Sequence, residues 1–567
     1  MRRFMTAWPG LAVLLLASAA LAAPPASPEF YKTASSDDWV SHTIKVQAKY
    51  DRVLVVTAGE APKSVSVAPL ELNARTPSAK AVDCPVIVVY RTLQEAADAA
   101  KGGDLVAVMP GTYSGFALGD NASCGDGKYI HFKAMGKPGE VTIDRPAEGK
   151  DRNWMVMFAA AHHAILEGFN IAGATGPGME QKGPQSGTFI GGNIVELGKL
   201  AHHIAIINNF SHNHRGWGLH SVETHTVLIQ GNCFALSSRE HSAYVSDGSD
   251  NYCIRRNVFF GSSSSGLQCN LDPLACLTKL VQVPGLTQFK DAPKTPEMAQ
   301  KLLEAATEKF GANNFPDGQG VNFIIEENVI NENGRRGGGS LNLAGLKESL
   351  IQNNFIYNNL TTGIAMWDNA NEWDAKLADP GPASAKDVKG PESLPFWGCQ
   401  NNVIRNNTVV MNVKGRPGIG LGNGSWGNVL RNNVALNDLT ESLDISNTSI
   451  YKTDSGFNVL NNATYNDMPE DLRPLAANLD EKNHSVLGVT LEKAAPEFVK
   501  MNTQPWVVIE GNWWRLNPAR PDFHPKAGSA LFAGKGDASQ LPPVDIDGSE
   551  RNGADIGAYR AVSTAGQ

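Results

Sequence analysis

VLIQGNCFALSSREHSAYVS, residues 227–246, is one copy of a pattern that recurs through the middle of the chain. In each copy an apolar, strand-like segment ends in asparagine, and some residues later a small residue introduces a second short strand. The preceding copy is IAIINNFSHNHRGWGLHS, and the following copy is YCIRRNVFFGSSSSGLQCN. The asparagines that mark the pattern are Asn209, Asn232, Asn257, Asn328, Asn354, Asn407 and Asn433. Self-similarity at this period indicates one supersecondary unit per repeat, stacked so that neighbours bury a common core.

The composition of the repeat favours a parallel β-helix over other solenoids. Its strands are short and rich in Val and Ile, with Gly and Asn at the corners. Leucine-rich repeats have a similar period but need Leu at most consensus positions, which this chain lacks. Each coil of a β-helix contributes short strands to long parallel sheets, and we expect the asparagines to form a hydrogen-bonded ladder along one corner.

Two further stretches, together with the repeats, resemble the right-handed parallel β-helix of the pectate-lyase-like superfamily. YRTLQEAADAAKGGDLVAVMPGTYSG (90–115) is similar to the cap helix and first strand that open that fold, and DFHPKAGSALFAG with DIDGSERNGADIGAYR is similar to its closing segment. The resemblance covers residues 84–560. It implies an all-β fold, a single-stranded right-handed parallel β-helix (solenoid) with an N-terminal cap helix. It implies no reaction, because the superfamily holds lyases, hydrolases, epimerases and non-catalytic proteins.

The N-terminus predicts export. Arg2 and Arg3 precede the apolar run LAVLLLASAALAA, and Ala20-Leu21-Ala22 suits a cleavage site, so residues 1–22 read as a signal peptide of a secreted or periplasmic protein. Residues 23–83 form an N-terminal extension around the strand-like TIKVQAKYDRVLVVTAG, and residues 561–567 form a tail. No later segment is apolar enough to predict a membrane span. The net charge of −8 argues against a nucleic-acid partner.

Two insertions interrupt the repeat, at residues 273–318 and 370–398. The first contains TPEMAQKLLEAATEKFG, which predicts a helix with Thr295 as its cap, Pro296 in its first turn and Gly311 at its end. Both insertions follow the same short strand of their coil. We therefore expect them to emerge at one edge and to form walls over a cleft.

Aligning the coils on that short strand predicts which side chains face outward. Leu219, Ala243 and Leu267 are 24 residues apart and are assigned to the core. Because side chains alternate along a strand, the next residue in each coil points out. The first outward row is His220, Tyr244, Gln268, Asn342, Ala365, Gly420 and Asp444. The row two positions on is Val222, Ser246, Asn270, Ala344 and Trp367.

Arginines occupy the turn before this strand. They are Arg215, Arg239, the pair Arg335 and Arg336, and Arg416. Such a row suits carboxylates or sulfates, which Arg binds bidentately. We therefore hypothesise an enzyme that cleaves an acidic, uronic-acid-containing polysaccharide by β-elimination. Arg239 and Arg215 would hold the uronate, His220 or His241 would take its proton, and Tyr244 would protonate the leaving group. The remaining expected substrate contacts are Glu240, Gln268, Asn270, Asn342 and Trp367.

Other interpretations stay open. A glycoside hydrolase needs two carboxylates, and Glu223, Glu240, Asp247, Asp272 and Asp368 lie near the proposed face. An epimerase would share the proton abstraction, and a non-catalytic glycan-binding protein would need none of these groups. Calcium is a candidate cofactor, with Asp247, Asp250 and Asp272 as ligands. Seven cysteines leave at least one unpaired, and Cys84–Cys124 and Cys269–Cys276 are candidate disulfides.

Overall fold

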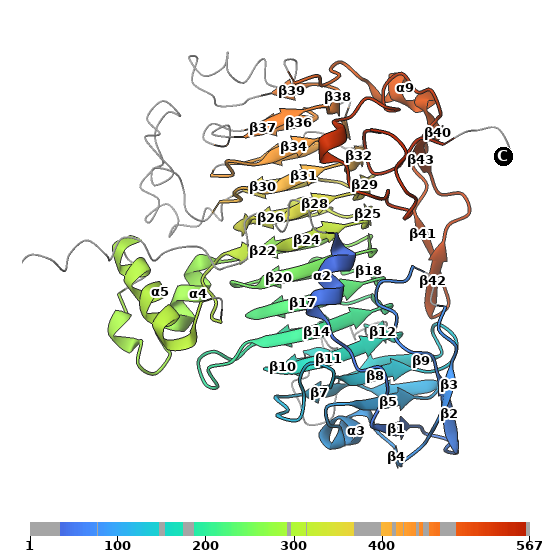
Figure 1. The fold of residues 1–567 in the computed structure, drawn as a ribbon, viewed down its shortest axis with the longest axis vertical. Coiled ribbons are helices and arrows are strands. Elements are labelled where there is room, and N and C mark those ends of the chain that lie inside the picture. The colour runs from blue at the N-terminus through green and yellow to red at the C-terminus, as the bar shows by residue number, and fades with distance from the viewer. Residues whose placement is uncertain are drawn as a thin grey trace, which may run out of the picture.

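The computed structural model describes residues 35–75, 78–146, 153–173, 186–291, 296–312, 314–367, 398–410, 416–422, 424–437, 441–445, 449, 453–464 and 483–562. The predicted signal peptide, Thr295, Asp368 and residues 370–397 of the second insertion lie outside them. The described residues form three long parallel sheets that run the length of the molecule (Figure 1). This confirms the all-β, right-handed parallel β-helix fold.

Each coil contributes one strand to each sheet. Sheet 1 has 13 described strands: β4 (Val88–Tyr90), β1 (Arg52–Val56), β5 (Asp104–Val108), β8 (Ile130–Ala134), β11 (His162–Glu167), β14 (Ala201–Ile207), β17 (Thr224–Gln230), β20 (Asp250–Arg255), β24 (Phe323–Glu326), β28 (Leu350–Gln352), β31 (Val403–Arg405), β34 (Val429–Arg431) and β37 (Asp454–Gly456). Sheet 2 has 11 described strands: β7 (Phe116–Leu118), β10 (Trp154–Ala159), β13 (Ser186–Gly191), β16 (Leu219–Val222), β19 (Ala243–Ser246), β22 (Leu267–Asn270), β26 (Gly339–Ala344), β30 (Thr362–Trp367), β33 (Ile419–Leu421), β36 (Leu443–Ile445) and β39 (Ala463–Thr464).

Sheet 3 also has 11 described strands: β6 (Gly111–Ser114), β9 (Val141–Arg145), β12 (Asn170–Ala172), β15 (Phe210–His212), β18 (Cys233–Ala235), β21 (Val258–Phe260), β25 (Val329–Asn331), β29 (Phe355–Tyr357), β32 (Thr408–Val410), β35 (Val434–Leu436) and β38 (Val459–Leu460). The chain passes from sheet 2 to sheet 1 and then to sheet 3 before it starts the next coil. The inward side chains of all three sheets form one continuous hydrophobic core, in which Leu219, Ala243 and Leu267 are fully buried.

The expected asparagine ladder follows the corner between sheets 1 and 3. The side-chain NH₂ of Asn209 donates to Oδ1 of Asn232, and the same bond recurs from coil to coil as far as Asn458, at 2.9–3.1 Å. Each side-chain oxygen also accepts the backbone N–H of the previous ladder residue, as Oδ1 of Asn257 does from Asn232. The ladder thus satisfies buried backbone groups where each coil turns.

The N-terminal end of the solenoid is covered as expected. The cap helix α3 (Leu93–Ala99) begins with a reciprocal capping box between Thr92 and Glu95 and buries Leu93. Strand β1, from the segment assigned to the N-terminal extension, pairs in parallel with β5 and continues sheet 1. The same region contributes the antiparallel pair β2 (Ser64–Val67) and β3 (Val82–Pro85).

Two of the three outer faces are covered by apolar packing. Helix α2 (Ser36–Thr43) lays Trp39 and Val40 on the outward side chains of sheet 1, including Ile165 and Leu228. The C-terminal segment 483–562 packs Phe498 and other aromatic residues on the outside of sheet 3 (Figure 1). That segment contains α9 (Leu491–Ala494), η6 (Ala495–Glu497), η7 (Ala538–Gln540), and the antiparallel pairs β40 (Phe498–Lys500) with β43 (Asp522–Pro525) and β41 (Val507–Glu510) with β42 (Trp513–Leu516). Among described residues no hydrophobic cluster covers sheet 2 in the same way.

The first insertion folds as a helical subdomain beside the solenoid (Figure 1). It contains α4 (Pro273–Leu280), η1 (Thr287–Phe289) and α5 (Pro296–Phe310), with Gly311 in a left-handed conformation at the end of α5. Their apolar faces pack on Ile194 and Leu200 of the solenoid. The short strands β23 (Gly320–Val321) and β27 (Leu346–Lys347) pair after it.

The structure corrects the disulfide expectation, since Cys84, Cys124, Cys269 and Cys276 are all free thiols. Cys269 points into the core of the solenoid, whereas Cys276 lies on α4, outside that core. In the part of the chain that the structure describes, no helix has both the length and the apolar character needed to cross a membrane.

Candidate functional site

The strand register places His220 opposite Tyr244, Tyr244 opposite Gln268, and Gln268 opposite Asn342. The second outward row is also as predicted, with Ser246 beside Asn270. The rings of His220 and Tyr244 are stacked, with centroids 4.9 Å apart and an angle of 4° between their planes. The 24-residue spacing therefore gave the correct register on sheet 2.

His220 lies in an aromatic group that the sequence analysis did not identify. Trp217 has its ring centroid 4.5 Å from that of His220, Trp154 lies 5.8 Å away and Phe189 lies 6.0 Å away. All of these side chains are half-buried. Phe189 could have been found, because it occupies the first outward row one coil before His220. Half-buried aromatic faces on a solenoid are suited to stacking on sugar rings.

The protonation states of His220 and Tyr244 suit proton transfer. Burial lowers the pKa of His220 to about 3, so its imidazole is neutral near pH 7 and can accept a proton. Burial raises the pKa of Tyr244, so its phenol keeps the proton it would donate. His220 Nε2 lies 3.2 Å from the Ser246 hydroxyl, while its Nδ1 is buried without a partner among the described residues.

His241 lies beside the row but is held differently. Its ring centroid is 5.3 Å from that of Tyr244, and its Nδ1 accepts the backbone N–H of Ser265 at 3.1 Å. Burial lowers the pKa of His241 to about 4. Because Nδ1 is the acceptor, the neutral ring carries its proton on Nε2, which faces Glu240 at 3.9 Å. His241 is therefore a hydrogen-bond donor on this side and not a free base.

Amide and indole groups extend the row beyond Tyr244. The NH₂ group of Asn342 donates to Gln268, and Nε1 of Trp367 donates to Oδ1 of Asn342 at 2.8 Å. Asn270 donates to the Tyr244 hydroxyl at 3.3 Å, and its own Oδ1 is buried without a partner among the described residues. These predicted substrate contacts are thus brought together, although Gln268 and Asn342 are only 5% and 7% exposed.

The predicted arginine turns do stack along one edge. The backbone N–H of Arg239 donates to the carbonyl of Arg215 at 3.0 Å, so the two side chains leave from successive coils. Arg239 is exposed and Arg215 is half-buried. Within the described residues neither guanidinium makes a hydrogen bond or ion pair, which leaves both available to an anion. Arg335, Arg336 and Arg416 are exposed further along the same edge.

A second feature missed from the sequence is Lys279 on α4. Its ammonium contacts the carboxylates of Glu223 at 2.6 Å and Asp247 at 2.8 Å. Glu223 and Asp247 are 24 residues apart, like His220 and Tyr244, and both adopt left-handed backbone conformations just after their strands. That spacing was the available signal for a carboxylate pair, whereas the contact with Lys279 depends on how the insertion folds back.

The described geometry does not fit the expected calcium site. Asp247 is neutralised by Lys279, and Asp272 caps α4 by accepting the N–H of Ala275 at 3.1 Å. Asp250 accepts the N–H of Val321, and its pKa is raised by burial and by neighbouring Asp317. Each of the three acids therefore has its own partner within the protein.

Comparisons with known proteins bear on the fold. No protein-family model matches the chain, and no curated protein matches it in sequence. Among solved structures, the chain is similar to pectate lyase Pel9A, with 13% identity, 92% of this chain and 99% of that chain covered, and a TM-score of 0.48. It is also similar to the PL6 family polysaccharide lyase Pedsa3628 from Pseudopedobacter saltans, with 14% identity, 82% of this chain and 97% of that chain covered, and a TM-score of 0.30. A third similar structure is the periplasmic alginate epimerase AlgG, with 10% identity, 64% of this chain and 74% of that chain covered, and a TM-score of 0.31.

At these identities and TM-scores the likenesses carry no statement about reaction or substrate. The fold rests on the strand pairing described above. By that pairing, the chain is a right-handed parallel β-helix protein.

Proposed function

We propose that the chain binds an acidic, uronic-acid-containing polysaccharide along the outside of sheet 2 and cleaves it by β-elimination. The observation that carries this proposal is the stacked pair of a neutral imidazole and a protonated phenol, His220 and Tyr244, on the strands that follow Arg215 and Arg239. The guanidinium groups of these two arginines have no partner among the described residues. This arrangement combines the three requirements of the reaction: a base, an acid and a counter-charge for the uronate.

The roles follow from the protonation states. His220 removes the C5 proton of the uronate, the C4–O bond breaks as the C4=C5 double bond forms, and Tyr244 gives its proton to the departing oxygen. His220 is favoured over His241 as the base because the Nδ1 lone pair of His241 is used by Ser265. A pKa near 3 makes free His220 a weak base, but a bound carboxylate beside it raises that pKa.

Arg215 and Arg239 hold the uronate carboxylate in this proposal. Their charge withdraws electron density from C5 and so makes its proton easier to remove. The aromatic side chains Trp154, Phe189 and Trp217 provide stacking surface for sugar rings on the side of His220 towards the N-terminal coils. The side chains from Gln268 to Trp367 line the surface of sheet 2 on the other side of Tyr244, towards the C-terminal coils.

The test is to incubate the protein with a panel of uronic-acid polysaccharides, with and without calcium, and to analyse the products by mass spectrometry and ultraviolet absorbance. Elimination gives oligosaccharides one water lighter than hydrolysis products, with an absorbing unsaturated end. Saturated products with new reducing ends would overturn elimination in favour of hydrolysis. Exchange of the C5 hydrogen with solvent without cleavage would indicate an epimerase, and binding without any product would indicate a glycan-binding protein.

A further inference from the structure

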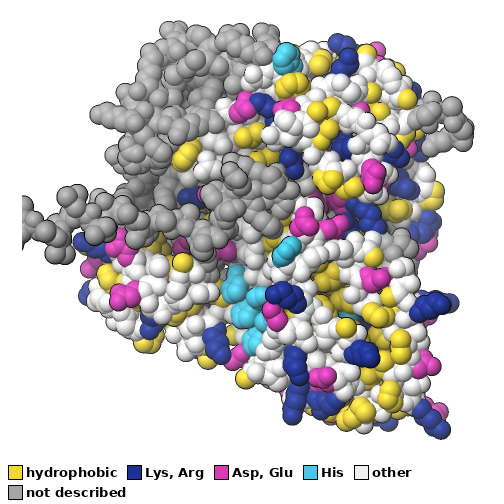
Figure 2. All heavy atoms as spheres, in the orientation of Figure 1, with side chains coloured by type: hydrophobic (Ala, Val, Ile, Leu, Met, Phe, Trp, Pro, Cys, Tyr) yellow, Lys and Arg dark blue, Asp and Glu magenta, His cyan; other side chains and the backbone are white. Residues whose placement is uncertain are grey.

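Five histidines gather at the N-terminal ends of three consecutive strands of sheet 1. His162 on β11 is opposite His202 on β14, and His202 is opposite His225 on β17. His163 and His203 follow the first two of these in the chain. Figure 2 shows histidine side chains collected in one place on this face of the molecule, close to the insertion that carries α5.

Backbone conformation explains why neighbouring histidines share a face. Side chains along a regular strand alternate, so His163 and His203 would point into the coil. Both have positive φ, 51° and 54°, which interrupts the alternation and turns each ring outward beside its neighbour. Left-handed conformations of this kind are unfavourable for histidine, so the arrangement is one that the local structure maintains at a cost.

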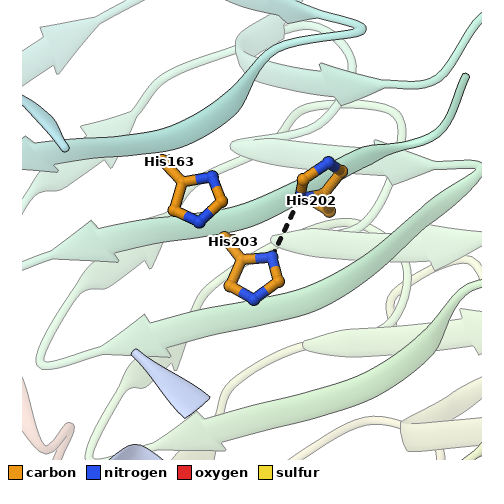
Figure 3. A group of neighbouring side chains, drawn as sticks. All are labelled: His163, His202 and His203. Carbon is orange, nitrogen blue, oxygen red and sulfur yellow. Dashed lines mark hydrogen bonds between the residues drawn. The ribbon is translucent and has the colours of Figure 1, made fainter. Parts of the chain in front are cut away.

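The imidazoles form two stacked columns. In the outer column the rings of His162, His202 and His225 have successive centroid distances of 5.0 and 4.8 Å, and in the second column those of His163 and His203 are 4.5 Å apart. Within the pair His202–His203 the two Nδ1 atoms are only 2.8 Å apart, as the dashed line in Figure 3 marks. Ligand atoms of His163, His202 and His203 all lie within 4.8 Å of one another.

Carboxylates lie behind the first pair of rings. Nε2 of His162 is 3.3 Å from Asp120, and Nε2 of His163 is 3.5 Å from Asp126. A histidine that coordinates a metal usually donates its other ring N–H to a carboxylate, which orients the ring and raises its basicity. The Nδ1 atoms of His162 and His163 then face each other, 2.9 Å apart.

The protein's own neighbouring coils show that a purely structural ladder needs no histidine here. The second column continues through Thr226, Asn251 and Asn322, each also with positive φ. The NH₂ group of Asn251 donates to Thr226 at 3.0 Å, and that of Asn322 donates to Asn251 at 2.7 Å. Short neutral side chains therefore satisfy this column, so five imidazoles on three strands call for a different explanation.

Solvent access suits a cation. A cavity of about 280 Å³ opens onto His162, His202 and His225, and Asp120 and Lys199 also line it. An ion can thus reach the outer column from solvent.

We propose that His163, His202 and His203 bind a divalent transition-metal ion of the zinc or copper class, with Asp126 orienting His163. Imidazole nitrogens select such ions over calcium and magnesium, which prefer oxygen ligands. Tetrahedral zinc needs ligand nitrogens about 3.3 Å apart, so the 2.8 Å Nδ1 contact of His202 and His203 opens only slightly to admit it. The bound ion cross-links β11 and β14. It is independent of the proposed cleavage site, which lies on sheet 2.

The experiment uses the full chain without a histidine tag, stripped with a chelator and titrated with Co²⁺ and then with Zn²⁺. We expect one Co²⁺ ion per chain to give the intense visible bands of four-coordinate Co²⁺. Zn²⁺ should displace the Co²⁺ and abolish these bands, whereas Ca²⁺ should not. The protein should also melt at a higher temperature with Zn²⁺ than without it. His202→Ala and His203→Asn should each weaken binding at least tenfold. His42→Ala, on an exposed position of α2, should leave it unchanged.

His203→Asn keeps the test valid if the alanine variant does not fold. Asparagine tolerates the left-handed conformation and already fills the equivalent position at Asn251 and Asn322. A Co²⁺ spectrum identical to that of the ion in buffer, or equal Zn²⁺ affinity in wild-type and His203→Asn proteins, would overturn the proposal.

Discussion

The imidazole of His220 and the phenol of Tyr244 lie parallel on successive strands of sheet 2, with an angle of 4° between the rings and 4.9 Å between their centroids. The same register fixes which outward side chains lie on either side of this pair. Aromatic side chains lie towards the N-terminal coils, and amide side chains lie towards the C-terminal coils. A base and an acid thus share one surface with a path for an extended polymer.

Tyr244→Phe tests the acid role most cleanly. The substitution keeps the ring that stacks on His220 and removes only the hydroxyl, so the fold and the polymer affinity should change little. Loss of a general acid should lower kcat about 100-fold or more. Steady-state kinetics on the cleaved polymer measures this, and the contrary result is a kcat within a few-fold of wild type.

The stability of the histidine group should depend on pH. A histidine whose folded pKa is lowered binds fewer protons when folded than when unfolded, so its contribution is lost as pH falls from about 6.5 towards the folded pKa. His202 and His203, with folded pKa values of about 2 and 3, act in this direction. Buried Glu327, with its pKa raised to about 7 by burial, acts in the opposite direction, so the variant must be compared with wild type.

His203→Asn removes one such group. As the pH falls from 6.5 to 5, the unfolding equilibrium constant of wild type should rise more steeply than that of the variant. The extra factor is about ten per pH unit, because wild type takes up one more proton on unfolding. Urea denaturation at several pH values measures the difference. Parallel curves for the two proteins would show that His203 is not a buried neutral group.

Lys279→Met should destabilise the protein by about 2 kcal/mol, because it leaves the buried Glu223 carboxylate and the half-buried Asp247 carboxylate without their counter-ion. The figure is reduced from that of a fully buried pair because Lys279 is 29% exposed. Lys301→Met on the exposed face of α5 is the matched control. If calcium stabilises Lys279→Met but not wild type, the two carboxylates can hold the ion once the ammonium is gone. A Lys279→Met protein as stable as the control would contradict the assigned ion pairs.

Asn328→Ala should cost about 3 kcal/mol, since the ladder side chain makes four hydrogen bonds and its loss leaves the N–H of Asn257 without this acceptor in the interior. Asn512→Ala in the exposed turn between β41 and β42 is the control. Denaturant unfolding compares the two, and similar small losses would show that the ladder contributes little.

Regular spacing made much of the fold predictable. Leu219, Ala243 and Leu267 recur at 24 residues, so the alternation of strand side chains was enough to place His220 beside Tyr244 and Gln268. The asparagine ladder was predictable from the same repeat, and the α3 cap from the resemblance of residues 90–115 to the opening of the fold.

What escaped prediction depends on breaks in that regularity or on distant segments. The left-handed conformations of His163 and His203 put neighbouring residues on one face, contrary to strand alternation. Lys279 reaches its carboxylates only because α4 folds back on the coil, and Trp217 lies in a turn whose direction no period gives. The roles assigned to His220, Tyr244 and the arginines remain predictions.

The most direct test of the central claim follows the ultraviolet absorbance of unsaturated uronate during cleavage of a uronic-acid polysaccharide, with wild type, His220→Ala and Tyr244→Phe proteins compared at equal concentration. The proposal predicts a rise with wild type that both substitutions abolish or slow about 100-fold or more, while polymer binding persists. A rise of the same rate in both variants would contradict the assignment of base and acid to His220 and Tyr244.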